Sequence, residues 1–348
     1  WCTPSYNAIL TCQNTNMDPW NTLPYLIVTG AVKATGDISN YSSAGSSLWI
    51  SAPGGQHAKK GLPFYFNGSK YWTCSSGKVC QPAILTTDLQ GCNKGVSQTG
   101  LTSPANAFEN NSNNLNPGCN YTSTMNGSSS AAPNLSGAVA LMLEANPDLT
   151  WRDVKYILAK TAEKVEPNTA PIYVGNYMAT QGWVTNAAGY PFHNWYGFGR
   201  VDVDAAMTLA KNYSKSFGTF QTCNWKSSGT INQQIPDYSS TGTSHTLSIS
   251  DSIKIEAVQI KVSATHYATG DLGVELVSPS GTKSIMLNII NGFYETDHLS
   301  DMVLLSNAFY QENSAGSWTI KVVDGVNLDW GTLTNWKIRF FGEGTCSN

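Results

Sequence analysis

The sequence predicts a chain of two domains, an α/β portion over residues 1–211 followed by an all-β sandwich over residues 217–348. Two stretches with the apolar spacing of helices follow one another before residue 162. Beyond residue 217 the pattern changes to alternating apolar and polar runs separated by turn signals, which is typical of strands with one buried face. A length of 348 residues is long for one hydrophobic core and sufficient for two.

The most informative segment reads NGSSSAAP at residues 126–133 and leads directly into the apolar run NLSGAVALMLEANP. A serine hydroxyl is a weak nucleophile, which needs a neighbouring base and hydrogen-bond donors for the developing oxyanion. We expect Ser129 to lie at a helix start, where free backbone N–H groups and the positive end of the helix dipole supply such donors. Gly127 permits a tight turn before it. The alternative is a serine-rich loop that only caps a core helix.

Two expectations concern the helix itself. Pro133 is expected in the first helical turn, where its missing N–H costs nothing. Gly137, Ala138 and Ala140 are small, so we expect this helix to pack tightly inside a domain.

A second helix is expected to begin after Thr150. Thr150 is predicted to be its N-cap, with Asp153 as the reciprocal partner in a variant of the capping box. Four residues at helical spacing predict one buried face: Val154, Ile157, Leu158 and Thr161.

These segments resemble the subtilisin-like serine proteases, or subtilases. NGSSSAAP is similar to the block that carries the nucleophile in that family, which places Ser129 at the position of the nucleophile. LEANPDLTWRDV at residues 143–154 and HNWYGFGRVDVDAA at residues 193–206 resemble the kexin and furin branch, the proprotein convertases. The resemblance implies an α/β subtilisin-like catalytic domain and a serine endopeptidase that works through an acyl-enzyme.

The C-terminal third resembles the P domain, a jelly roll that follows the catalytic domain in kexin-like proteases. Strands are predicted at residues 245–250, 253–262 and 273–277, with a turn at residues 278–281. The strings GDLGVELVSPSGT, SAGSWTIKVVD and GTLTNWKIRFFG carry the resemblance. A sugar-binding jelly roll has a similar composition. The position directly after the protease-like block favours a P domain, which would brace the catalytic portion.

Composition excludes several classes of function. Only 12% of the residues are charged and the formal net charge is −3, so no basic stripe indicates a nucleic-acid partner. No apolar run approaches the ~18 residues of a membrane helix. The eight cysteines include no C-x-x-C pair, which argues against a zinc site. They indicate an oxidising compartment, so we expect a secreted, extracellular or periplasmic protein.

Two cysteines flank the predicted sandwich. We predict that Cys223 and Cys346 form a disulfide that joins its two ends. Spacing alone does not determine how the other six cysteines pair. A short loop closed by Cys74 and Cys80 is the favoured pairing among them.

The catalytic partners of Ser129 pose a problem. A subtilase has its triad in the order Asp, His, Ser, with an oxyanion-hole asparagine between His and Ser. Only His57 precedes Ser129, in the segment GGQHAKKG, which indicates a polar surface loop. The strings LIVTGAV, SNYSSAGS and SAPG before residue 55 resemble what a subtilase has after that asparagine. We therefore expect the chain to start after the position of the oxyanion-hole asparagine, as a processed or truncated product. The catalytic Asp, His and Asn are then expected on a separate N-terminal portion.

Two alternatives stay open. An α/β-hydrolase orders its triad Ser, Asp, His, which would recruit Asp153 and His193, but the second glycine of that nucleophile elbow is lacking. The chain could also be an inactive remnant that acts as a β-sandwich binding module. The remaining histidines are expected at the surface or at strand ends: His245, His266 and His298.

Kexin-like enzymes cleave after Lys or Arg because a carboxylate in the first specificity pocket binds that cation. The segment CQNTNMDPWNT at residues 12–22 resembles the CDGYTN segment of the family, which places Asp18 as the pocket acid. The alternative is a turn opened by Asp-Pro. Asp88 in TTDLQGC matches another kexin-like string and is interpreted as structural.

The resemblance also implies structural calcium and a propeptide or chaperone that assists folding. Where the convertases carry a calcium-binding glutamate, the segment Tyr41-Ser42-Ser43 offers only a serine. Five acidic residues of the β domain are alternative ligands or turn caps: Asp271, Asp297, Asp301, Asp324 and Asp329. The dibasic pair Lys59-Lys60 is either a self-cleavage site or two surface lysines.

Overall fold

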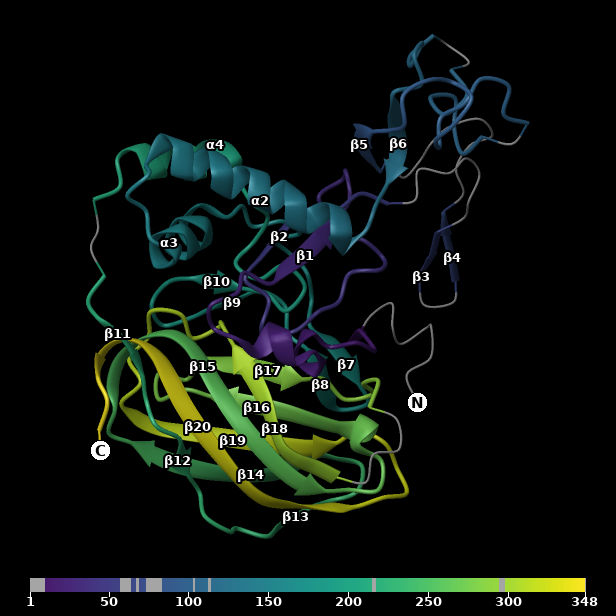
Figure 1. Cartoon of the computed structure of the whole chain (residues 1–348). Coiled ribbons are helices and arrows are strands. Elements are labelled where there is room, and N and C mark those ends of the chain that lie inside the picture. The colour runs from purple at the N-terminus through teal and green to yellow at the C-terminus, as the bar shows by residue number, and fades with distance from the viewer. Residues whose placement is uncertain are drawn as a thin grey trace.

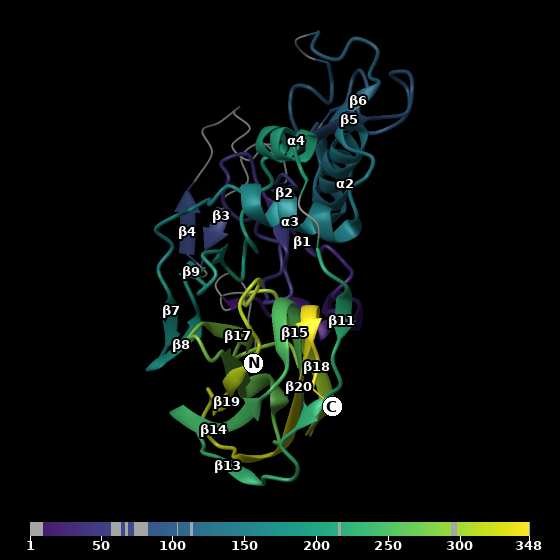
Figure 2. The ribbon, with the colours of Figure 1, turned by 90° about the vertical axis from the view of Figure 1, so that its left-hand side faces the viewer.

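The computed structural model describes residues 10–56, 64–66, 69–72, 83–102, 104–111, 114–214, 217–293 and 298–347. Helices and a small parallel sheet form one part, and two antiparallel sheets form a sandwich beside it (Figure 1). Figure 2 shows the same two parts after a rotation of 90°. The predicted order of an α/β subtilisin-like portion followed by a β-sandwich is confirmed. His57, Lys59, Lys60, Cys74, Cys80 and Asp297 lie outside the described residues.

The α/β portion is built around a short parallel pair of strands. β1 (Thr29–Val32) runs parallel to β2 (Ile50–Pro53), and α2 (Ser128–Ala145), α3 (Trp151–Thr161) and α4 (Val203–Lys211) pack around them. Their shared core includes Trp49, Ile157 and Phe198. The other elements are η1 (Thr15–Met17), η2 (Pro19–Thr22), β3 (Phe64–Phe66), β4 (Ser69–Trp72), β5 (Ile84–Thr87), β6 (Tyr121–Met125), β7 (Ile172–Val174), β8 (Tyr177–Thr180), β9 (Val184–Thr185) and β10 (Pro191–Phe192).

Two expectations about α2 are wrong. The helix begins at Ser128, so Pro133 falls in its second turn and not its first. Because proline has no N–H, the carbonyl of Ser129 lacks its usual donor four residues later. Ala138 is buried as expected, but Gly137 and Ala140 are exposed. A Cβ added at Gly137 would meet nothing within 4 Å, so α2 is not packed on all sides by the described chain.

The second helix confirms the prediction from local sequence. Thr150 is the N-cap of α3, and Asp153 completes a capping box with it. The Asp153 carboxylate accepts from the backbone N–H of Thr150 at 2.8 Å. Val154, Ile157 and Leu158 are buried at helical spacing, as predicted, and Thr161 is half-buried.

The sandwich contains a sheet in the order β11-β20-β15-β18, extended by β12 and β13 along β20, and a second sheet in the order β14-β19-β16-β17. The predicted strands correspond to β14, β15 and β16, and the predicted turn is present, since the N–H of Gly281 donates to the carbonyl of Ser278. The elements are β11 (Phe220–Thr222), β12 (Lys226–Ser227), β13 (Gln233–Ile235), β14 (Ser239–Ile249), β15 (Ser252–Thr265), η3 (Thr269–Asp271), β16 (Leu272–Val277), β17 (Lys283–Leu287), β18 (His298–Ser306), β19 (Gly316–Asp324) and β20 (Gly331–Thr345).

The predicted disulfide between Cys223 and Cys346 is confirmed, and it joins the two ends of the sandwich. His266 directly follows β15, as the strand-end expectation has it, but its burial was not expected. His266 is buried, and its Nε2 lies 3.2 Å from the carboxylate of Asp324. Burial alone would lower the pKa of His266, but the hydrogen bond and charge of Asp324 outweigh it and raise that pKa.

Polar side chains join the sandwich to the α/β portion. Arg152 of α3 forms a buried ion pair with Glu256 of β15. Asn307, just after β18, donates to the carbonyl oxygens of Ser47 and Leu48 at 2.9 and 3.2 Å. Since these bonds cross the interface from both sides and are buried, the two parts form one packed structure.

Candidate active site

The turn before α2 holds Ser129 at the start of the helix, as predicted. Gly127 has φ 117° and ψ 169°, a conformation that is essentially reserved for glycine. Its carbonyl accepts from the N–H groups of Ser130 and Ala131 at 2.9 and 3.2 Å. The side chain of Ser129 is exposed, and among the described residues its hydroxyl has no hydrogen-bond partner. Ser129 is therefore accessible to a substrate. Its role as a nucleophile stays a prediction.

Two free backbone N–H groups lie at this helix start. The N–H groups of Ser128 and Ser129 have no acceptor within the described ranges, because the first helical hydrogen bonds begin further along α2. Both lie at the positive end of the helix dipole. Free donors fixed in this way suit the oxyanion of a tetrahedral intermediate.

A tyrosine holds the other side of the turn. The phenol oxygen of Tyr41 lies 2.7 Å from the carbonyl oxygen of Gly54 and 2.6 Å from that of Gly55. The same oxygen accepts from the N–H of Gly127 at 2.9 Å. Gly127 also donates to the carbonyl of Gly54 at 3.1 Å. The strand end after β2 and the turn before α2 are thus joined by a direct backbone hydrogen bond and by the hydroxyl of Tyr41.

No described residue supplies a base to Ser129. His193 is buried, its Nδ1 accepts from the N–H of Trp195, and burial together with the charge of Lys164 lowers its pKa to about 3. Asp153 is engaged in the capping box. Neither side chain is bonded to the other or to Ser129, so the structure contradicts the order Ser, Asp, His for this chain. His57, expected in a polar surface loop, lies outside the described residues.

Asp18 lies at the junction of two short helical turns. Its side chain is exposed, and Oδ1 accepts from the N–H of Trp20 at 3.0 Å as the N-cap of η2. Its neighbours Met17 and Pro19 line a cavity of about 420 Å³ between η1, η2 and β18. The structure brings Asp18 into no described hydrogen bond with the turn around Ser129. Its assignment as a pocket acid stays a prediction.

The described side chains do not fit calcium well. Ser42 is already engaged, since its hydroxyl accepts from the N–H of Ala31 at 3.0 Å. Asp301 pairs with Lys337, and Asp324 pairs with His266. In the ranges that the structure covers, no three His, Cys, Asp or Glu side chains gather as metal ligands do.

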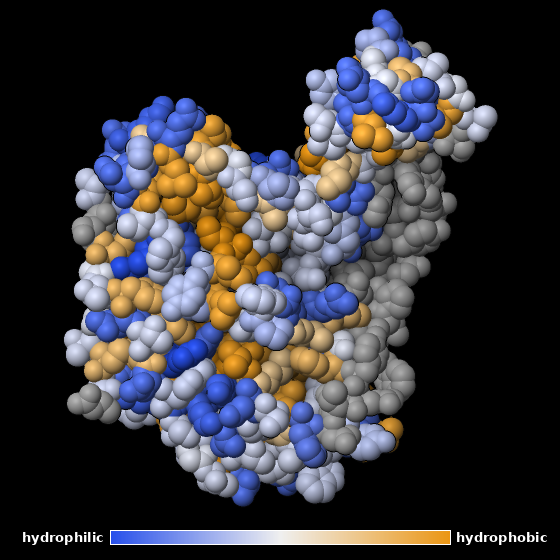
Figure 3. All heavy atoms as spheres, in the orientation of Figure 1, coloured by the Kyte–Doolittle hydropathy of each residue, from blue (hydrophilic) through white to orange (hydrophobic). Residues whose placement is uncertain are grey.

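The outward face of α2 is largely apolar up to the exposed Glu144, and the described chain does not cover it. Pro133, Gly137, Ala140 and Leu141 recur at helical spacing on this face, and Leu141 is 44% exposed. Figure 3 shows apolar side chains gathered over α2 and continuing below it toward the sandwich. The parallel sheet beneath consists of only β1 and β2 in the described chain, whereas parallel sheets normally have more strands and are covered on both faces.

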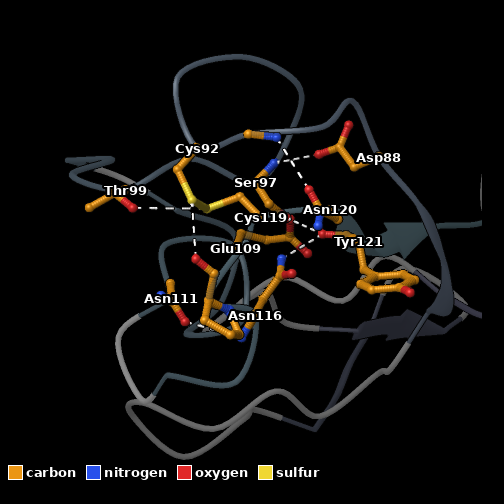
Figure 4. Close-up of a disulfide and its surroundings, with 12 residues drawn as sticks. Asp88, Cys92, Ser97, Thr99, Glu109, Asn111, Asn116, Cys119, Asn120 and Tyr121 are labelled. Carbon is orange, nitrogen blue, oxygen red and sulfur yellow. Dashed lines mark hydrogen bonds between the residues drawn. A yellow bond between two sulfur atoms is a disulfide. The ribbon is translucent and has the colours of Figure 1, made fainter.

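The sequence pattern did not indicate a lobe that residues 83–102, 104–111 and 114–125 form (Figure 1). This lobe projects from the body and leads through β6 into the turn before Ser129. Figure 4 shows its disulfide between Cys92 and Cys119. The buried carboxylate of Glu109 accepts from the hydroxyls of Ser97 and Ser123. No alternating pattern marks this lobe, because polar side chains and a disulfide hold it together.

Asp88 belongs to the same lobe and is structural, as interpreted from the sequence. Its carboxylate accepts from the N–H groups of Ser97, Leu89 and Val96. These bonds, that of Ser97 first, lower the pKa of Asp88 against the opposing effect of burial.

Comparisons with protein families match both parts of the chain. The model of the subtilase family matches residues 12–199. The model of the proprotein convertase P-domain matches residues 255–340. None of the helices in the described ranges combines the length and the apolar character that a membrane span needs.

Comparisons with individual proteins agree with these family matches. The chain is 36% identical to an extracellular serine protease of Aeromonas sobria over 90% of its own length and 50% of that protein. It is 25% identical to furin of Bos taurus over 85% of its own length and 36% of that protein. A crystal structure of the Aeromonas sobria serine protease in complex with a chaperone superposes with a TM-score of 0.82 at 33% identity, over 96% of this chain and 60% of that one. The chain spans about half the length of the two Aeromonas relatives that it matches.

Proposed function

Because this chain belongs to the subtilase family, we propose that it is the serine-bearing portion of a secreted serine endopeptidase. Ser129 attacks the carbonyl of the scissile peptide bond, and its own N–H and that of Ser128 are the candidate oxyanion donors. One observation carries the proposal. The segment NGSSSAAP places an exposed serine at the start of an apolar helix, with free N–H groups beside it. Inhibition of peptide hydrolysis by a serine-directed phosphonate tests the reaction class.

We propose further that the catalytic Asp and His come from an N-terminal portion of the same protease. The uncovered apolar face of α2 and the two-stranded parallel sheet support this, because both need a further layer of protein. The portion that covers α2 would reach Ser129, which lies at the start of the same helix.

Cleavage after Lys or Arg, with Asp18 as the acid that binds the cation, is the finer proposal. The resemblance of the segment CQNTNMDPWNT supports it, and the exposed side chain of Asp18 is accessible to a substrate. We expect Asp18→Asn to reduce the preference for Arg over Met before the cleaved bond by about 10- to 100-fold, the value of one charge-assisted hydrogen bond. The measurement is kcat/KM for two peptides that differ only at that residue.

Asparagine retains an oxygen that can cap η2, so this variant separates the charge from the structural role of Asp18. The matched control is Asp148→Asn, which alters an exposed aspartate in the turn after α2. An unchanged ratio in Asp18→Asn would exclude Asp18 as the pocket acid.

Three further proposals rest on likeness. A chaperone or propeptide partner is proposed because the Aeromonas relative was solved with a chaperone. Secretion is proposed from the disulfides and from the extracellular relative. Structural calcium is proposed from the family resemblance alone, and the described side chains do not support it.

A further inference from the structure

We propose that Tyr41 is a positioning residue of the active site, which fixes the turn that carries Ser129 by holding Gly127 in place. This inference rests on the proposed function, since it assumes that Ser129 reacts. The phenol oxygen of Tyr41 contacts the carbonyls of Gly54 and Gly55 and accepts from the N–H of Gly127. These three contacts are the basis of the inference.

The position of Gly127 decides the position of Ser129. Glycine has no side chain to restrict its backbone, so the position of Gly127 depends on the hydrogen bonds that it makes. Its carbonyl is the first acceptor of α2, and among the described residues its N–H has two acceptors, the hydroxyl of Tyr41 and the carbonyl of Gly54. A shift of Gly127 would therefore move both the hydroxyl and the N–H of Ser129. Displacements on the order of 1 Å at a reacting group cost about a hundredfold in rate.

The contact between the two backbone segments is close. A Cβ on Gly54 would lie 3.0 Å from the carbonyl oxygen of Gly127 and 3.0 Å from the phenol oxygen of Tyr41. Loss of the Tyr41 hydroxyl would leave the carbonyl of Gly54 as the one described acceptor for the N–H of Gly127.

Tyr41 is itself anchored on both sides. Ser39 donates through its hydroxyl to the carbonyl of Gly55 at 2.7 Å. On the other side of Tyr41, the next residue, Ser42, is held to β1 because its hydroxyl accepts from the N–H of Ala31. The ring of Tyr41 packs against the hydrophobic core of the α/β portion. These contacts fix the loop that carries Tyr41, and they therefore fix the position of its hydroxyl relative to Gly127.

The experiment compares Tyr41→Phe with the unmodified enzyme in an active preparation of the full protease. The ring and its packing stay, and only the hydroxyl is lost. We expect kcat to fall about 10- to 100-fold while KM changes by less than about threefold, because the turn moves but the substrate pocket does not. The rate of labelling by a fluorophosphonate should fall by the same factor as kcat.

The matched control is Ser314→Ala in the sandwich. Ser314 is buried, and its hydroxyl also bridges a carbonyl and an N–H, those of Asp251 and Ile253 at 2.6 and 2.8 Å. Its loss destabilises the protein in a comparable way, but kcat should stay within about twofold of the unmodified enzyme. A role of Tyr41 in stability alone would give both variants the same kinetics.

If Tyr41→Phe does not fold, p-aminophenylalanine at position 41 replaces it. Its amine can donate to the carbonyls of Gly54 and Gly55 but is a poor acceptor for the N–H of Gly127, so kcat should still fall. An unchanged kcat in the folded variant, or a change confined to KM, would overturn the inference. If Tyr41→Phe is fully active while Ser129→Ala is inactive, the role of Tyr41 fails and the proposed function stands.

Discussion

Replacing Ser129 with alanine is expected to lower kcat for peptide hydrolysis by about 10⁴- to 10⁶-fold, since no other group can form the acyl-enzyme. The melting temperature should not change, because the side chain is exposed and its hydroxyl has no hydrogen-bond partner among the described residues. Steady-state kinetics and a thermal melt of the same sample measure both effects.

The matched control for this variant is Ser136→Ala. Ser136 is exposed on the same helix, and its hydroxyl donates to the carbonyl of Ala132 at 3.0 Å. This control should retain full activity. Hydrolysis by Ser129→Ala at the unmodified rate would exclude Ser129 as the nucleophile.

The second large effect concerns the interface with the sandwich. Arg152→Ala is expected to lower the free energy of unfolding by about 3–5 kcal/mol, because it leaves the carboxylate of Glu256 buried without its partner. The two side chains are only 9% and 8% exposed. Arg152 also donates to the carbonyl of Gly218 and lies 4.6 Å from the ring centre of Phe217. Chemical denaturation of the two proteins measures the difference.

Two controls sharpen this prediction. The double variant Arg152→Met with Glu256→Met should recover most of the lost stability, because it removes the uncompensated charge. Arg200→Ala breaks the more exposed pair with Glu163, where the side chains are 33% and 51% exposed, and should cost less than about 1 kcal/mol. A loss in Arg152→Ala no larger than in Arg200→Ala would contradict the view that this pair secures the sandwich to α3.

Features set by neighbours in the chain could be predicted from the sequence. The capping box of Thr150 and Asp153 and the turn at Ser278 depend on residues a few positions apart, so their patterns are sufficient. The disulfide of Cys223 and Cys346 followed from their positions on either side of the sandwich.

Features set by distant contacts could not be predicted. The bridge from Tyr41 to Gly127 depends on how two segments 86 residues apart meet. Lys155 is buried, donates to the carbonyl of Pro24 at 2.7 Å, and has its pKa lowered to about 7 by burial, yet its sequence position resembles that of a surface lysine. His266 lies at a strand end as expected, but its buried contact with Asp324, 58 residues later, could not be predicted from the sequence. The apolar periodicity of α2 indicated burial, but not that one face stays uncovered in the described chain.

The most direct test of the central claim is treatment of the native protein with a fluorophosphonate, followed by peptide mass mapping. The probe reacts with a serine only when a base activates it. The proposed function predicts a label on Ser129, which would require that a catalytic histidine be present beside it. A folded, native protein without a label on Ser129 would contradict the claim and would favour an inactive remnant that acts as a binding module through its β-sandwich.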